Sequence, residues 1–136
     1  MLRWGVRIPA GRVLFGAVLL GAACSGCAAA DEDGVQAAVS GLYQAVRNGD
    51  GRAACEHLLP RAASALETGG SQCAQEILGL GLEGGPVAEV EVWSDQARAS
   101  AGTDTVFLTR WGEGWRISAA GCRAQGERPY DCEVQA

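Results

Sequence analysis

The stretch "EGGPVAEVEVWSD", residues 83–95, marks a change in the hydrophobic period of the chain. Its residues alternate between apolar and polar, which is typical of a half-buried β-strand. The alternation places Ala88, Val90 and Val92 on one face. Glu89 and Glu91 share the other face with Trp93, and we expect these two carboxylates to face solvent rather than to form a catalytic pair.

The same alternation continues downstream in "QARAS" (96–100), "DTVFLTRW" (104–111) and "WRISAAGC" (115–122), the last two separated by the turn "GEG". Upstream, apolar residues recur every three or four positions, as in amphipathic helices. Helices followed by strands predict an α+β domain, with the helices packed on one face of an antiparallel sheet of about four strands.

The first helix has the clearest pattern. The acids Asp31-Glu32-Asp33 are predicted to open it, since they suit the positive end of a helix, and Asp33 with Gln36 resembles a capping box. It is predicted to end at "NGDG" (48–51), where Asp50 can cap the next helix. Its apolar face consists of Val35, Val39, Leu42, Tyr43 and Val46.

Three shorter helices are predicted before residue 83. "RAACEHLL" (52–59) is stopped by Pro60, and "RAASALE" (61–67) follows it. After a Gly-Gly break, Ser71 is expected to cap "QCAQEILGL" (72–80).

The N-terminus predicts export. Residues 1–12 carry three arginines and no acid, and an uncharged apolar run follows from Val13 to Ala23. This pattern is typical of a secretory signal peptide over residues 1–23. A membrane-spanning anchor is disfavoured because residues 16–30 are rich in Gly, Ala, Ser and Cys.

The segment "LGAAC", ending at Cys24, resembles the lipobox of bacterial lipoproteins, in which the cysteine receives a diacylglycerol and becomes the new N-terminus. Cys27 is the alternative, and cleavage after Ala30, which releases a secreted chain, is a third reading. Residues 24–32 are then a flexible acidic leader, and residues 33–136 a single domain. The Cys24–Cys27 spacing does not predict a redox motif, because it lies within the processing segment.

Charge excludes some partners. Without residues 1–23 the chain keeps eight arginines against 16 acids, a net charge near −8. An acidic chain is a poor ligand for nucleic acid, and attraction to anionic lipid is equally unfavourable. Membrane attachment is therefore expected through acyl chains alone.

Four further cysteines are expected to form disulfides in an exported chain. Three connectivities exist, and we favour Cys55–Cys73 and Cys122–Cys132, because each pair lies within one local section. A zinc site is disfavoured by irregular spacing and a single histidine, so we expect no metal and no cofactor.

"LYQAVRNGDGRAACEHLLP", followed by "VEVWSDQARA", "DTVFLTRWGEGWRISAAGC" and "PYDCEV", resembles the cone-shaped domains similar to nuclear transport factor 2 and ketosteroid isomerase, found in lipoproteins of high-GC Gram-positive bacteria. The resemblance implies a sheet curved around a helix, with a pocket at its wide end.

In enzymes of this fold a pocket Asp, His or Tyr usually moves protons, and the candidates here are His57, Glu56, Tyr43, Asp104 and Tyr130. His57 is the catalytic candidate to test, although its proximity to Cys55 favours a structural role. Aromatic residues that could line a pocket are Tyr43, Trp93, Phe107 and Trp115.

These observations predict a lipid-anchored protein on the outer face of the bacterial cytoplasmic membrane, or alternatively a secreted one. We expect a non-catalytic module that binds a small apolar ligand or an envelope protein. The alternative is a small enzyme that uses general acid-base chemistry in a cone pocket.

Overall fold

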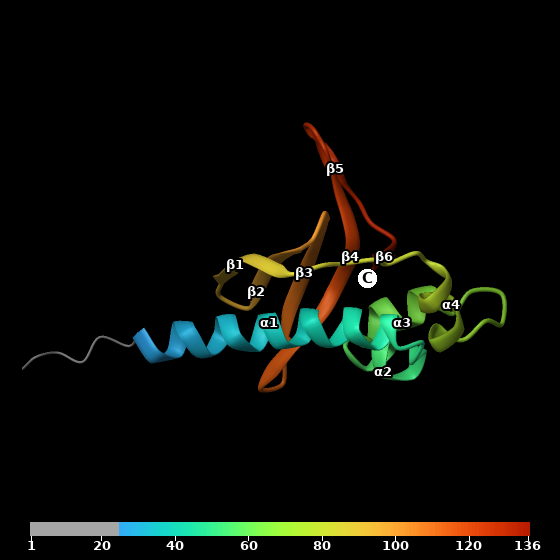
Figure 1. Cartoon of the computed structure of the whole chain (residues 1–136), viewed down its shortest axis with the longest axis horizontal. Coiled ribbons are helices and arrows are strands. Elements are labelled where there is room, and N and C mark those ends of the chain that lie inside the picture. Colours follow the sequence, from blue (N-terminus) through green and yellow to red (C-terminus); the bar gives the residue numbers. More distant parts are fainter. Residues whose placement is uncertain (1–24) are drawn as a thin grey trace, which may run out of the picture.

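The computed structural model describes residues 25–136, so residues 1–23 and Cys24 lie outside the described part. Four helices come first: α1 (Ser25–Arg47), α2 (Gly51–Glu56), α3 (Pro60–Leu66) and α4 (Cys73–Gly79). Six strands follow: β1 (Val87–Trp93), β2 (Gln96–Ala101), β3 (Asp104–Trp111), β4 (Gly114–Gln125), β5 (Arg128–Asp131) and β6 (Val134–Gln135). Figure 1 shows α1 lying across the sheet and α2–α4 clustered near the C-terminal end of α1. The α+β class is confirmed.

Helix α1 buries most of the predicted face: Val35, Val39, Leu42 and Tyr43 are buried, and Val46 is half-buried against the same core. Its predicted start is wrong, because α1 begins at Ser25 rather than within residues 31–33. Residues 25–32, predicted as a flexible leader, form its first turns. The cause is local, since this segment contains three consecutive alanines, the best helix formers.

The three short helices lie where they are predicted, with two errors at their ends. Asp50 caps α2 as predicted, its side chain accepting a hydrogen bond from the Ala53 N–H at 3.0 Å. The predicted stop of the second helix at Pro60 is wrong, because α2 already ends at Glu56 and the backbone of residues 57–59 bonds to Ile117 of β4. Pro60 instead begins α3, since a proline at the first helical position loses no hydrogen bond. The predicted Ser71 cap is wrong: Gln72 is the N-cap of α4, without a side-chain bond.

The sheet is antiparallel and not closed, with strand order β1-β2-β3-β4-β5 and with β6 paired to β4. Six strands replace the predicted four, because the segment after Gly126 returns twice to β4. Residues 123–125 of β4 pair with β5, and Ala119 and Ala120 pair with β6.

Strand β1 contains a β-bulge that the sequence pattern hides. Ala88 pairs with Ser100 and Glu91 with Arg98, so Glu89 and Val90 together lie opposite one residue of β2. Glu89 adopts a positive φ of 48°. Because a bulge adds one residue to the strand, Ala88 is exposed and Val87 takes the half-buried position. The predicted apolar face is therefore wrong at Ala88 and holds at Val90 and Val92.

The core lies between α1 and one face of the sheet. Buried sheet residues on this face are Ala97, Ala99, Ala101, Val106, Leu108 and Ile117. The three alanines of β2 leave room for the large side chains of α1, among which Leu42 and Tyr43 are almost completely buried. The side chains of helix and sheet fill this space together.

Both predicted disulfides are present, Cys55–Cys73 and Cys122–Cys132. The first joins α2 to the start of α4, where the backbones are in close contact. A Cβ atom at Gly51 would lie 1.8 Å from the carbonyl oxygen of Ala74, so only glycine permits this approach. The second disulfide joins β4 to the segment after β5.

Candidate functional site

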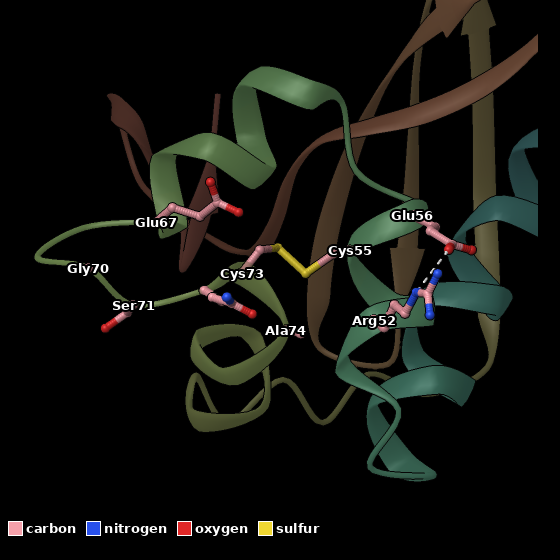
Figure 2. Close-up of a pocket in the computed structure, with 9 residues that line it drawn as sticks. Arg52, Cys55, Glu56, Glu67, Gly70, Ser71, Cys73 and Ala74 are labelled. Carbon is pink, nitrogen blue, oxygen red and sulfur yellow. Dashed lines mark ion pairs between the residues drawn. A yellow bond between two sulfur atoms is a disulfide. The ribbon is translucent and has the colours of Figure 1, made fainter.

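Helix α2 separates two surface hollows. The first, the disulfide hollow, has a volume of about 610 Å³ and lies between α2, the loop after α3 and the start of α4. Its lining residues are Arg52, Cys55, Glu56, Glu67, Gly70, Ser71, Gln72, Cys73 and Ala74. Figure 2 shows the Cys55–Cys73 bridge in the middle of this hollow, with Glu67 on the opposite side from Arg52 and Glu56.

The charges of the disulfide hollow lie at its rim. Arg52 Nε is 3.9 Å from Glu56 Oε1, and both side chains are largely exposed (Figure 2). An exposed pair of this kind contributes little to stability. Two acids and one arginine therefore surround a floor fixed by a covalent bridge.

The second, the tryptophan hollow, has a volume of about 580 Å³ and lies between α1, α2 and the β3–β4 turn. Its lining residues are Ala37, Ala38, Ala53, Glu56, His57, Trp111, Gly114, Trp115 and Arg116. The structure thus brings together two residues that the sequence analysis singled out, His57 and Trp115.

Trp115 is held in place by a short chain of contacts. Its ring is almost fully buried, and the guanidinium of Arg110 lies 4.4 Å from the ring centroid, in a cation–π arrangement. The same guanidinium lies 2.9 Å from an Asp31 carboxylate oxygen. This contact connects the start of α1 to the end of β3.

His57 occupies a tightly packed position at the end of α2. Its carbonyl accepts a hydrogen bond from the Ile117 N–H at 2.9 Å, and the Leu59 N–H donates to the Ile117 carbonyl at 2.8 Å. Gly41 of α1 lies directly against the imidazole, because a Cβ there would be 2.4 Å from Cε1. Burial lowers the pKa of His57 below its ordinary value, with Arg116 adding to the effect and Glu56 opposing it.

Tyr43 and Asp104, 61 residues apart in the chain, meet in the core. The Tyr43 hydroxyl donates to Asp104 Oδ2 at 3.1 Å, and both side chains are buried. Burial raises the pKa of Tyr43 well above its ordinary value, and the neighbouring Asp104 raises it further. Asp104 is the one buried charged residue among residues 26–136.

The four aromatic residues predicted for a pocket do not line a common cavity. Trp115 lines the tryptophan hollow, and Tyr43 borders a third hollow beside Gly85. Phe107 lies in a fourth hollow against Tyr130, with ring centroids 5.1 Å apart. Trp93 lines none of these hollows and is exposed.

The remaining predicted residues lie at the surface. Glu89 and Glu91 are exposed, and Glu91 forms an ion pair with Arg98 at 2.9 Å. Cys24 lies outside the described residues, whereas Cys27 is an exposed free cysteine within α1. Within residues 25–136 no helix is both long and apolar enough to cross a membrane, and no three His, Cys, Asp or Glu side chains gather as metal ligands.

Sequence reasoning did not find the Tyr43–Asp104 pair or the Asp31–Arg110 contact. Both join residues far apart in the chain, and no local pattern marks either partner. No known family model matches the chain, and neither a curated protein nor a solved structure is detectably similar to it.

Proposed function

We propose that the chain is an exported, lipid-anchored envelope protein that acts as a non-catalytic binding module for a neighbouring envelope protein. Lipidation falls on Cys24 in this proposal, with Cys27 as the alternative. The anchored domain then lies on the outer face of the cytoplasmic membrane, attached through its acyl chains. The resemblance to cone-shaped domains, including a curved sheet, belongs to the same proposal.

The two disulfides are the observation that carries the proposal. They pair four of the six cysteines, and such bridges persist in oxidising compartments. The basic and apolar N-terminus supports the same location. A covalent framework also suits a domain of about 100 residues, which has a small core.

The disulfide hollow favours a protein partner over a small apolar ligand. Pockets for apolar ligands are enclosed and mostly apolar, whereas this hollow is open and has charged side chains at its rim (Figure 2). The space between α1 and the sheet is filled by core side chains such as Leu42 and Leu108. The disulfide already restricts the backbone at the bottom of this hollow. Binding of a partner there therefore loses less conformational entropy than binding to a flexible segment.

Intact mass of the membrane-extracted protein tests export and anchoring. We expect a chain that starts at Cys24, carries a diacylglycerol and is lighter than its reduced form by the hydrogens of four thiols. Cys24→Ala should leave the protein unprocessed, and Cys27→Ala, the matched control, should change nothing. A cytosolic, fully reduced chain that retains Met1 would overturn the proposal.

Site-specific photocross-linking in cells tests the binding surface. A photoreactive residue at exposed Gln72, on the rim of the disulfide hollow, should give a discrete adduct, and one at exposed Gln44 on α1 should not. Glu67→Arg, which reverses a rim charge, should remove the adduct. An adduct that persists in this variant, or that forms equally at both positions, contradicts the proposed surface.

A second candidate function is an enzyme that uses His57 as a general base in the tryptophan hollow. The position of His57 beside Trp115 and Arg116 in this hollow favours it. Burial lowers the pKa of His57, so the imidazole is neutral at pH 7 but is a weaker base than an exposed one. The substitution His57→Gln distinguishes the two functions. It removes the general base of an enzyme but leaves the disulfide hollow and its cross-link intact.

A further inference from the structure

Among residues 26–136, two of the three exposed large apolar side chains lie at one end of the sheet. Trp93 is 49% exposed and Trp111 is 54% exposed. Trp93 is the last residue of β1 and Trp111 the last residue of β3, so each lies next to a strand turn. The third, Leu78, is 39% exposed and belongs to α4.

The strand register places both tryptophans at the same end of the sheet. Trp93 pairs with Gln96, which pairs with Thr109 across the next ladder. Thr109 is two residues before Trp111 in the same strand. The β1–β2 and β3–β4 turns therefore lie side by side at one end, called here the turn end.

Helix α1 begins at this same end. The Asp31–Arg110 ion pair fixes its early turns beside the residue that precedes Trp111. From there α1 runs past α2, which lines the tryptophan hollow together with the β3–β4 turn, toward α3 and α4 at the other end of the molecule (Figure 1). Asp31 is six residues from Ser25, a rise of about 9 Å along a helix.

We infer that the turn end contacts the surface of the bilayer, with the indoles of Trp93 and Trp111 in its headgroup region. The inference rests on the proposed lipid anchor, since Cys24 directly precedes in sequence Ser25, the first residue of α1. The headgroup layer adds about 5–8 Å on each side of the hydrocarbon. A tilted α1 therefore brings the turns to this layer.

Tryptophan suits this position because its ring is apolar and its indole N–H forms hydrogen bonds with headgroups. Two indoles alone bind membranes weakly. When the acyl chains already hold the protein on the membrane, however, their contact is intramolecular and occurs at high effective concentration. Asp95 and Glu113 lie within the two turns, so the contact does not depend on anionic lipid.

Quenching by brominated lipid tests the inference on the full lipidated chain in phosphatidylcholine vesicles. The processed chain contains three tryptophans, Trp93, Trp111 and the buried Trp115. We expect bromination of the acyl chains to reduce the tryptophan fluorescence of the wild-type chain. The double variant Trp93→Phe/Trp111→Phe, which retains only Trp115, should remain unquenched. Leu78→Trp in that double variant places an exposed indole at the other end and should also remain unquenched.

Flotation with the vesicles separates this inference from the proposed function. A chain that floats while Trp93 and Trp111 stay unquenched overturns the membrane contact and leaves the anchor intact, with the turn end free for a protein partner. Equal quenching of the Leu78→Trp reporter also overturns it, because the orientation is then random. A chain that does not float overturns the anchor and the contact together.

Discussion

Replacing Cys55 and Cys73 together with alanine should lower the free energy of unfolding by about 3 kcal/mol at 25 °C, as expected for a bridge that closes a loop of about 18 residues. The bridge restricts the unfolded chain, so its removal stabilises the unfolded state by chain entropy. The direct loss of packing is small, because alanine retains the Cβ atom of each cysteine. Urea unfolding of the variant and the oxidised wild type measures the difference.

The second disulfide provides a matched control. Cys122 and Cys132 are separated by 10 residues, so the chain-entropy model gives only a few tenths of a kcal/mol less for their removal. Their loop contains a strand turn at the sheet edge, whereas the Cys55–Cys73 loop contains all of α3. A loss below about 1 kcal/mol for Cys55→Ala/Cys73→Ala would contradict the view that the bridge holds α2 against α4.

The same helices show how far local patterns determine the fold. The apolar face of α1, the Asp50 cap and the disulfide pairs could be predicted, because each depends on residues close together in sequence. The start of α1 could not be predicted in this way. An acidic cluster followed by Gln36 predicts a cap at Asp33, but the alanines before it propagate the helix and Arg110, almost 80 residues later, forms an ion pair with Asp31.

In the sheet, too, features set by local sequence could be predicted, whereas features set by pairing with distant residues could not. Its strands were predicted from alternation, yet the bulge at Glu89 depends on pairing with β2 and leaves no mark on the alternating pattern. A one-residue insertion shifts every earlier side chain to the other face, which explains the error at Ala88. The short strands β5 and β6 have little pattern of their own and form because β4 is long enough to pair with both.

The candidate site was less predictable than the fold. His57 and Trp115 were singled out, and they share a hollow because the backbone of residues 57–59 bonds to Ile117 of β4. Residue type also drew attention to Tyr43 and Asp104 as proton-transfer groups. Their burial against each other was not predictable, since it requires the packing of α1 on β3.

The Tyr43–Asp104 hydrogen bond should have a large effect on stability. Tyr43→Phe leaves a carboxylate in the core without its donor, and we expect a loss of about 2–3 kcal/mol at pH 7. Tyr130→Phe is the matched control: it removes the same hydroxyl from a half-buried ring at the sheet edge, and should change stability by less than about 0.5 kcal/mol. Equal effects of the two substitutions would contradict a special role for the buried pair.

The pH dependence of unfolding provides an independent measurement of the burial of Tyr43 beside Asp104. Because the pKa of Tyr43 is raised in the folded protein, the unfolded chain loses the Tyr43 proton first, near pH 10. The native state then binds more protons than the unfolded state. Stability therefore falls above pH 10, with a contribution from Tyr43 of about 1.4 kcal/mol per pH unit.

Tyr43→Phe should lack this contribution, so wild type and variant should approach each other in stability as the pH rises above 10. Urea unfolding at pH 9, 10 and 11 measures the convergence, with Cys27 alkylated beforehand so that its thiolate does not exchange with the disulfides. A constant difference across this range would mean that the Tyr43 hydroxyl ionises equally in both states. The core would then admit solvent between α1 and β3, and a pocket at that position, as the cone-fold resemblance implies, would again be the better explanation.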